Sequence, residues 1–495
     1  MSILTLFVVI PLLMLLGLWL SKNLNQVRGV MVVGATALLA LSIWLTVYFI
    51  DQRASGNTAN MLLTYSVTWF EPLKIAYSVG VDGISVVMIL LSAIIVFTGT
   101  FASWQLKPLT KEYFLWFVLL SIGVFGFFIS TDMFTMFMFY EVALIPMYLL
   151  IGVWGTGPKE YSAMKLTLML MGGSALLILG ILGIYFFSGA QTMNVADLAQ
   201  LHAMPKSIQN IFFPFVFIGF GVLGALFPFH TWSPDGHASA PTAVSMLHAG
   251  VLMKLGGYGC LRIAMFLMPD ALELWCPVFL VLTTISVVYG ALSACVQTDL
   301  KYINAYSSVS HCGMVLFALL MCTQTAITGA ILQMLSHGLM TALFFALIGM
   351  IYGRTHTRDI RLMGGLMKIM PFLGVAYVIA GMASLGLPGL SGFVAEMTIF
   401  VGSFEHTDMF HRTFTIIACC SIVITAVYIL RVVGKLLFGP VQDKHHLELT
   451  DATWWERLSA ITLIVCVAGI GCFPEFFEWL IRFTFNPEIF HAIGM

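Results

Sequence analysis

Charged residues are scarce in this sequence. They make up 9% of its 495 residues, against about 25% in an ordinary soluble domain, while 60% of the residues are hydrophobic. Because a membrane-spanning helix needs about 20 apolar residues, this length leaves room for more than about a dozen spans with short connections. The composition therefore predicts one integral membrane domain with no soluble catalytic domain attached.

Basic runs, cofactor motifs and metal-binding motifs are missing as well. The formal net charge is -1 and no lysine-rich or arginine-rich stretch occurs, so we expect no nucleic-acid partner. No C-x-x-C pair and no G-x-G-x-x-G between a strand and a helix is found, so we expect no cofactor and no metal on this chain, and any electron chemistry must occur on other chains. The nine cysteines, which lie within or beside apolar runs, are interpreted as small buried hydrophobic residues; among them are Cys260, Cys295, Cys312, Cys419 and Cys420.

Apolar runs long enough to cross a bilayer recur along the whole chain. Backbone groups in lipid must be satisfied within their own segment, so these runs are expected to be helices. About fourteen spans are predicted, at Ser2–Leu20, Gly29–Ile50, Gly83–Ser103, Tyr113–Ser130, Met133–Val153, Ser162–Phe187, Ile211–Phe229, Pro241–Phe266, Leu274–Gln297, Tyr302–Met321, Ala326–Tyr352, Met370–Val401, Thr413–Leu437 and Leu458–Phe473. The first run lacks a positively charged lead and a small-residue cleavage site, so we interpret it as a retained span and not as a signal peptide.

Two of these spans carry helix-breaking residues. The twelfth is too long for one straight span and contains Gly386, Pro388, Gly389 and Gly392, so the helix should break there. The seventh span contains Pro214 and Pro228 and is expected to be interrupted too. Broken helices at corresponding places in two halves indicate inverted repeats around a transport path, although ordinary proline kinks are an equal alternative.

Loop charges predict the orientation of the bundle, because cytoplasmic loops carry the excess of lysine and arginine. One set of alternate loops holds Lys22, Arg28, Lys107, Lys111, Lys159, Lys301, Arg354, Arg358, Arg361, Lys368, Lys435 and Lys444. The opposite set holds only Arg53, Lys74, Lys206, Arg412 and Arg482. Both termini are therefore expected on the outer side.

Ionisable residues deep within apolar segments are the candidate functional residues. Each charged group costs roughly 2.5 to 3.5 kcal/mol at the centre of a membrane helix, so such groups do not accumulate by chance. The candidates are Glu141, Lys165, Lys254 and Glu396, with His248, His311 and His337. Taken singly, each carboxylate is explained equally well as part of a structural ion pair, and each histidine is better explained as bound to a neighbouring carbonyl. Spread over several spans, they match the proton relays of membrane pumps.

The segment FPFHTWSPDGHASAPTA places His230 and His237 at a predicted membrane edge. Metal binding is conceivable there, but the spacing fits no standard zinc pattern. We favour a structured connection.

Several long motifs resemble one membrane-protein family along nearly the whole chain. They are VDGISVVMILL, FYEVALIPMYLLIGVWG, FPFHTWSPDGHASAPTAVSMLHAGVLMKLGGYG, DLKYINAYSSVSHCGMV, RTHTRDIRLMGGL and LGLPGLSGFVAEMTIFVGSF. With these motifs the sequence resembles the antiporter-like subunits of respiratory complex I (NADH-quinone oxidoreductase) and of Mrp antiporters, and most closely those of the M type.

The resemblance implies an all-α polytopic fold of about fourteen spans with two inverted five-helix repeats. It divides the chain into an N-terminal three-helix region (residues 1–112), a first repeat of spans four to eight (113–266), a second repeat of spans nine to thirteen (267–437), and a C-terminal span and tail (438–495). It also implies proton-handling roles for Glu141 in the fifth span, Lys254 in the eighth, His311 in the tenth, His337 in the eleventh and Glu396 in the broken twelfth.

One position departs from the family pattern. Relatives usually carry a lysine seven residues before the histidine of P-F-H, and this position is Leu223 here. That lysine is thought to pair with the fifth-span glutamate, so Glu141 would lack its usual opposite charge. Lys165, in the adjacent sixth span, is the expected substitute partner. An alternative is a subunit that translocates protons poorly and acts mainly as a structural link.

The resulting expectation is a proton-translocating subunit of NADH-quinone oxidoreductase in the bacterial inner (cytoplasmic) membrane. NADH, FMN, iron–sulfur clusters and quinone would be bound by partner chains, among which are the L-type and N-type antiporter-like subunits of the membrane arm. A subunit of an Mrp-type sodium/proton antiporter and a structural subunit with an impaired channel are the alternatives.

Overall fold

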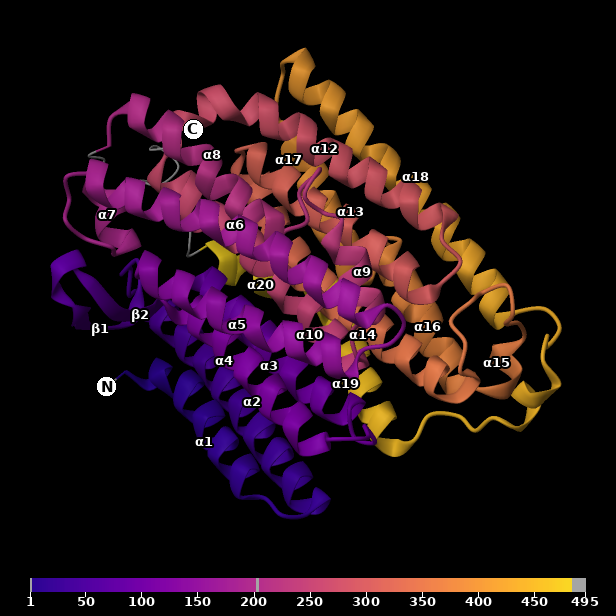
Figure 1. The fold of residues 1–495 in the computed structure, drawn as a ribbon. Helices are drawn as coiled ribbons and strands as arrows, with labels where there is room; N and C mark the ends of the chain where they lie inside the picture. The colour runs from indigo at the N-terminus through magenta and orange to yellow at the C-terminus, as the bar shows by residue number, and fades with distance from the viewer. Residues whose placement is uncertain (1, 202–203, 483–495) are drawn as a thin grey trace.

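The computed structural model describes residues 2–201 and 204–482, so the final part of the predicted C-terminal tail, residues 483–495, lies outside the described residues. The chain is a bundle of long helices that run alongside one another (Figure 1). The N-terminal region consists of α1 (Leu6–Leu20), α2 (Leu24–Ala54), β1 (Leu62–Phe70), β2 (Ile75–Val81), α3 (Gly83–Ala102) and α4 (Thr110–Ile129).

The middle of the chain forms a second group of helices, several of them short. They are α5 (Met133–Trp154), α6 (Lys159–Phe187), α7 (Val195–Leu201), α8 (Lys206–Leu223), α9 (Trp232–Ser239), α10 (Thr242–Leu247) and α11 (Met253–Gly259). Residues 242–267 are helical throughout, with π-helical turns at His248–Leu252 and Cys260–Met265.

The remaining helices belong to the second half of the chain. They are α12 (Leu272–Val296), α13 (Leu300–Leu320), α14 (Gln324–Thr355), α15 (Leu366–Ile369), α16 (Pro371–Ser384), α17 (Ser391–Phe404), α18 (Met409–Leu437), α19 (Trp454–Cys472) and α20 (Pro474–Arg482). In the apolar 18-residue stretches of α13 and of α14, 94% of the residues are buried, whereas the figure for α19 is 28%. The centre of the bundle is therefore built around α13 and α14.

The prediction of an all-α polytopic membrane protein is confirmed. Twelve helices of the described residues are long and apolar enough to cross a membrane. The two remaining predicted spans correspond to the helix at 242–267, which π turns divide, and to the pair α16 and α17, which have 14 residues each. A total of fourteen spans and the inverted repeats stay predictions.

Both predicted helix breaks are present. Helix α8 ends at Leu223, helical structure resumes at Trp232, and the break contains Pro228. Pro214 lies inside α8 without interrupting it. The second break separates α16 from α17 at residues 385–390, where Gly386 and Gly389 adopt positive φ angles of 70° and 93° that glycine tolerates.

The antiparallel hairpin of β1 and β2 was not predicted. Its register runs from Leu62 opposite Val81 to Phe70 opposite Ile75. Figure 1 places the hairpin and α7 at one end of the bundle and α15 at the opposite end. Open sheet edges are excluded only where the backbone lies in lipid. A hairpin is therefore allowed in a connection beyond the helix ends.

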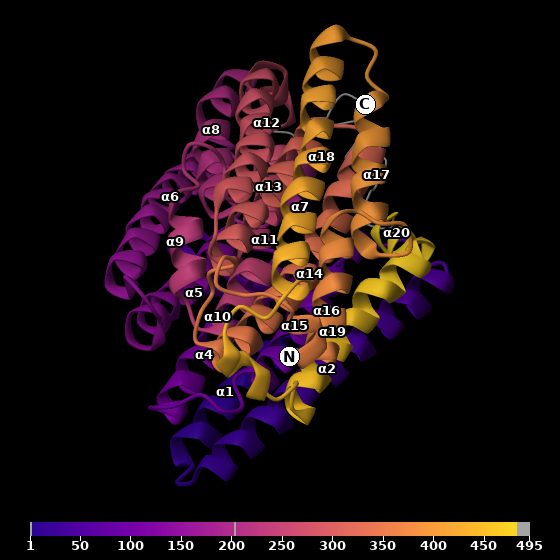
Figure 2. The ribbon, with the colours of Figure 1, turned by 90° about the vertical axis from the view of Figure 1, so that its right-hand side faces the viewer.

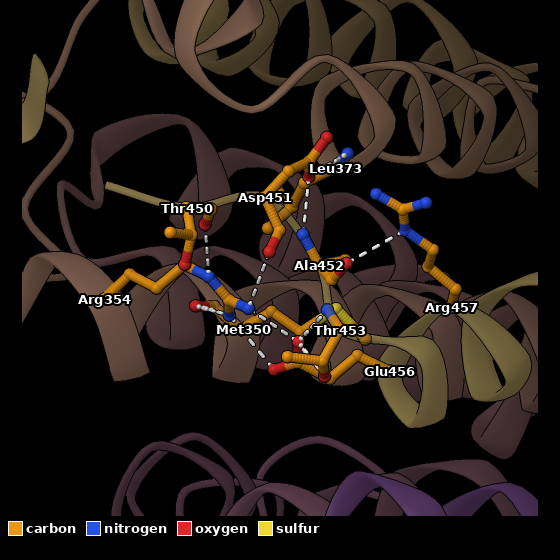
Figure 3. Close-up of polar contacts among 9 residues, drawn as sticks. All are labelled: Met350, Arg354, Leu373, Thr450, Asp451, Ala452, Thr453, Glu456 and Arg457. Carbon is orange, nitrogen blue, oxygen red and sulfur yellow. Dashed lines mark hydrogen bonds and ion pairs between the residues drawn. The ribbon is translucent and has the colours of Figure 1, made fainter. Parts of the chain in front are cut away.

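A polar cluster joins three helices at the α15 end of the bundle (Figure 3). Arg354, at the end of α14, forms a two-pronged ion pair with Glu456 of α19, with N–O distances of 2.6 and 3.0 Å. The carboxylate of Asp451 accepts hydrogen bonds from the backbone N–H groups of Phe372 (2.8 Å) and Leu373 (3.4 Å) in the first turn of α16. These bonds satisfy N–H groups that a helix start leaves open, so the cluster fixes the half-helix that leads to the second break.

Candidate functional site

Four predicted residues from four helices form one continuous row in the middle of the bundle. Lys254 of α11 places its Nζ 2.7 Å from Nδ1 of His337 on α14. The ring of His337 lies 5.2 Å, centroid to centroid, from the ring of His311 on α13. Nδ1 of His311 lies 3.6 Å from Oε1 of Glu396 on α17. None of the four residues is more than 7% exposed, so the row lies in the packed interior.

The helix that carries Lys254 is locally widened. The π-helical turn at His248–Leu252 ends directly before Met253, and the Lys254 ammonium donates a hydrogen bond to the carbonyl of Ala249. Turns of this kind occur frequently at functional sites, because they change how side chains and carbonyls face the neighbouring helices. Here the turn supplies a second acceptor for the ammonium beside His337.

The second helix break brings backbone close to the carboxyl end of the row. A Cβ atom added at Gly386 would lie 2.8 Å from Oε2 of Glu396. Ser384, at the end of α16, has its hydroxyl 3.5 Å from Nε2 of His311. The break therefore shapes the surroundings of both Glu396 and His311.

If the row transfers protons, Gly386→Ala should reduce the transfer about tenfold or more, because the added methyl group would displace the Glu396 carboxylate. Gly389→Ala is the matched control, since Gly389 also has a positive φ but has no atom within 4 Å of an added Cβ. Both variants carry a similar backbone cost of roughly 1–2 kcal/mol. Proton uptake by proteoliposomes measures the difference, and equal losses in both variants would contradict the assignment to Glu396.

Gln333 is a member of the site that the sequence did not reveal. Its side-chain amide nitrogen donates to Nδ1 of His311 at 3.0 Å. Gln333 precedes His337 by four residues on α14, so both side chains lie on one helix face. That spacing was the available signal, although a neutral amide in an apolar run gives no indication of its partner.

A second histidine pair, His237 and His248, lies near Lys254. The rings of His237 and His248 are 4.4 Å apart, and His248 stacks on Trp232 at 5.3 Å. Neither ring nitrogen of His248 has a hydrogen-bond partner among the described residues. His237 belongs to the connection FPFHTWSPDGHASAPTA, which is structured as predicted and includes α9.

Lys165 does not pair with Glu141, so this expectation is corrected. Its Nζ lies 2.7 Å from Oδ2 of Asp235 in α9, whose other oxygen accepts from the hydroxyl of Tyr302 at 3.1 Å. The helix geometry explains the difference. Glu141 interacts with Ser174, which follows Lys165 by nine residues on α6, about 13 Å along the axis.

Glu141 is therefore separate from the row. It is half-buried on α5, and its Oε1 has no hydrogen-bond partner in the described part of the chain. Leu223 is fully buried at the end of α8. Gly173, next to Ser174, packs against Val222, so Leu223 lies in the neighbourhood where a cation for Glu141 would be expected.

Residues 130–425 match the family described as the transmembrane part of NADH:quinone oxidoreductase and Mrp antiporters. The chain belongs to this family. Members at the level of whole chains include NAD(P)H-quinone oxidoreductase chain 4 2 of Thermosynechococcus vestitus, which is 35% identical over 446 residues, 89% of this chain and 83% of the relative. NAD(P)H-quinone oxidoreductase chain 4 1 of a Synechococcus strain is 34% identical over 477 residues, 95% of this chain and 89% of the relative.

Chains of two solved membrane complexes share this fold. A chain of respiratory complex I from Thermus thermophilus with bound NADH aligns over 98% of this chain and 100% of its own length, with a TM-score of 0.85 and 24% identity. A chain of the Mrp complex from Dietzia sp. aligns over 99% of this chain and 98% of its own, with a TM-score of 0.85 and 19% identity. At these identities the similarity shows the fold alone.

Proposed function

We propose that this chain is a proton-translocating membrane-arm subunit of an NADH-quinone oxidoreductase in a bacterial cytoplasmic membrane. The observation that carries the proposal is the row of Lys254, His337, His311 and Glu396. Buried ionisable groups are costly in a membrane. A row of them within reach of one another is therefore typical of an ion or proton pathway. The names of the chain 4 relatives support the assignment to a quinone reductase.

The row suggests how protons would move. Lys254 donates to His337 at Nδ1, and Nε2 of His337 has no partner among the described residues and can pass a proton onward through water. Glu396, whose Oε1 lies 3.6 Å from the His311 ring, is the next group that would take up the proton, with water bridging the gap. The contact between Lys254 and His337 supports a path in which His337 precedes His311.

We propose that protons reach Lys254 from the end of the bundle whose loops carry more lysine and arginine residues. The histidine pair His237 and His248 lies in this direction, and the Lys301 ammonium donates to the carbonyl of Ala240 at 2.6 Å close to them. The polar pair of Lys165 and Asp235 lies at the same end.

Redox energy would reach the row through electrostatics. Two unit charges about 5 Å apart interact by about 3 kcal/mol at an effective dielectric constant of about 20. Adding or removing a charge at one end of the row therefore changes the proton affinity of the next member. NADH, FMN, iron–sulfur clusters and quinone would be bound by partner chains, and the L-type and N-type subunits would be the membrane-arm neighbours.

Purification in mild detergent tests the proposed complex. Flavin-containing and iron–sulfur subunits should co-purify with this chain, together with other antiporter-like subunits. Purified membranes should also couple NADH oxidation to proton translocation. Recovery of a complex without redox subunits would replace the proposal with an Mrp-type sodium/proton antiporter, whose fold this chain shares.

The missing cation near Glu141 favours the second alternative, a structural subunit with an impaired channel. Leu223→Lys separates the two cases. If the row already conducts, the added lysine should leave proton translocation unchanged or slow it, because a buried charge is costly unless it is well paired. A gain in protons translocated per NADH would favour the impaired channel. Leu223→Met, which conserves volume without charge, is the control.

A further inference from the structure

A histidine–aspartate cluster at the turn between α17 and α18 has no part in the row. Figure 2 shows these two helices side by side. The rings of His406 and His411 stack with centroids 4.1 Å apart. Asp408 lies between them in sequence, with one carboxylate oxygen 3.7 Å from Nδ1 of His406 and another 2.8 Å from Nδ1 of His411. The three side chains offer three ligand atoms within 4.8 Å of one another.

The tautomer of His406 suits metal binding. Its Nε2 lies 2.6 Å from the carbonyl oxygen of Met321, at the end of α13. A carbonyl only accepts, so Nε2 carries the proton and Nδ1 presents its lone pair toward Asp408. Histidines that bind metals commonly donate their other N–H to a backbone carbonyl in this way, which fixes the ring.

Contacts with neighbouring groups also hold the other two side chains, those of Asp408 and His411, in place. Asp408 caps α18 by accepting from the backbone N–H of His411 at 3.0 Å, and its Oδ2 also lies 2.8 Å from Nδ1 of the His411 ring. The thiol of Cys276 on α12 contacts the His411 side chain. Arg412 binds the carbonyl of His406 at 2.9 Å and so fixes the turn.

We propose that Nδ1 of His406, the carboxylate of Asp408 and Nδ1 of His411 bind a divalent metal ion of the zinc class. Two imidazoles and one carboxylate suit Zn²⁺ and similar metals better than Ca²⁺ or Mg²⁺, which prefer oxygen ligands. The proton on Nδ1 of His411 would move to Nε2 of the same ring. Water would complete the coordination, because the Asp408 side chain is 48% exposed.

The required movement is small. Ligand atoms of a tetrahedral zinc site with bonds of about 2.05 Å lie roughly 3.3 Å apart, and the three ligand atoms here lie within 4.8 Å of one another, so each pair needs to approach by about 1.5 Å at most. The bound ion would tie the α17–α18 turn to the end of α13 through His406 and Met321. These helices carry Glu396 and His311, but the metal site does not depend on the proposed function of the row.

Elemental analysis of the purified complex tests the site. After equilibration with limiting Zn²⁺ and removal of free metal, the wild-type complex should hold one more zinc ion per chain than complexes with His406→Ala or His411→Ala. Their affinity should fall by about 100-fold or more. His445→Ala, which removes an exposed histidine elsewhere, is the control and should match the wild type.

A further variant separates metal binding from helix capping. Asp408→Ser keeps a capping side chain for α18 but removes the carboxylate, so it should fold normally and lose the zinc ion. X-ray absorption of the zinc-loaded wild type, compared with His411→Ala, should show an additional nitrogen and oxygen shell at about 2.0–2.1 Å. Equal zinc content in wild type and all three variants, or no zinc-dependent shell in the wild type, would overturn the proposal.

Discussion

Glu396→Gln is expected to abolish proton transfer through this chain. Glutamine keeps the shape of the side chain and removes the carboxylate that we propose exchanges a proton with His311, whose Nδ1 lies 3.6 Å away. A positioned acid or base contributes about 100-fold or more to a proton-transfer rate, so the contribution of this row to proton pumping should disappear. The measurement is the number of protons translocated per NADH oxidised in proteoliposomes.

Two further variants interpret the Glu396 result. Glu396→Asp retains a titratable carboxyl and should recover part of the transfer. Glu405→Gln removes an exposed carboxylate just beyond the end of the same helix and should have no effect on stoichiometry. Undiminished pumping by Glu396→Gln would remove this residue from the path.

The second large effect is expected at Lys254. Lys254→Gln removes the ammonium that contacts His337 at 2.7 Å, and the rate of proton transfer should fall by about 100-fold or more. Lys254→Arg is the more informative change, because arginine keeps the positive charge but does not release its proton near neutral pH. If the lysine acts as a proton donor, both variants should lose transfer to a similar extent.

Comparing Lys254→Arg with Lys254→Gln tests whether Lys254 has a purely electrostatic role. Retention of pumping by Lys254→Arg, together with its loss in Lys254→Gln, would mean that only the charge matters. Lys435→Met replaces an exposed lysine of α18 and should leave pumping unchanged. Assembly of the complex, followed by its NADH oxidation rate, shows whether each variant is folded.

Much of the fold followed from the sequence. The helical segments and the break at residues 385–390 were predicted, because lipid requires each segment to satisfy its own backbone and because proline and glycine interrupt that pattern. The hairpin of β1 and β2 and the short helix α7 were missed. They lie beyond the ends of the spanning helices, where the backbone is not in lipid and need not form all its hydrogen bonds within one helix.

Four members of the candidate site were predicted, whereas Gln333 and several of the contacts were not. Lys254, His311, His337 and Glu396 were selected because ionisable groups stand out in apolar runs. Lys165 was assigned to the wrong partner, because adjacency of spans does not give the depth of a side chain along each helix. The cluster of His406, Asp408 and His411 was not recognised, since its spacing matches no standard motif.

The sequence alone determined that this chain lies in a membrane, where two of its helices break, and which ionisable residues are candidates for carrying protons. Those properties depend on solvation and backbone geometry within single segments. Tertiary structure alone decided that Lys254 contacts His337, 83 residues away, and that Lys165 forms its ion pair with Asp235 and not with Glu141. Contacts between helices depend on how side chains pack at a given depth and rotation, which the pattern within one segment does not specify.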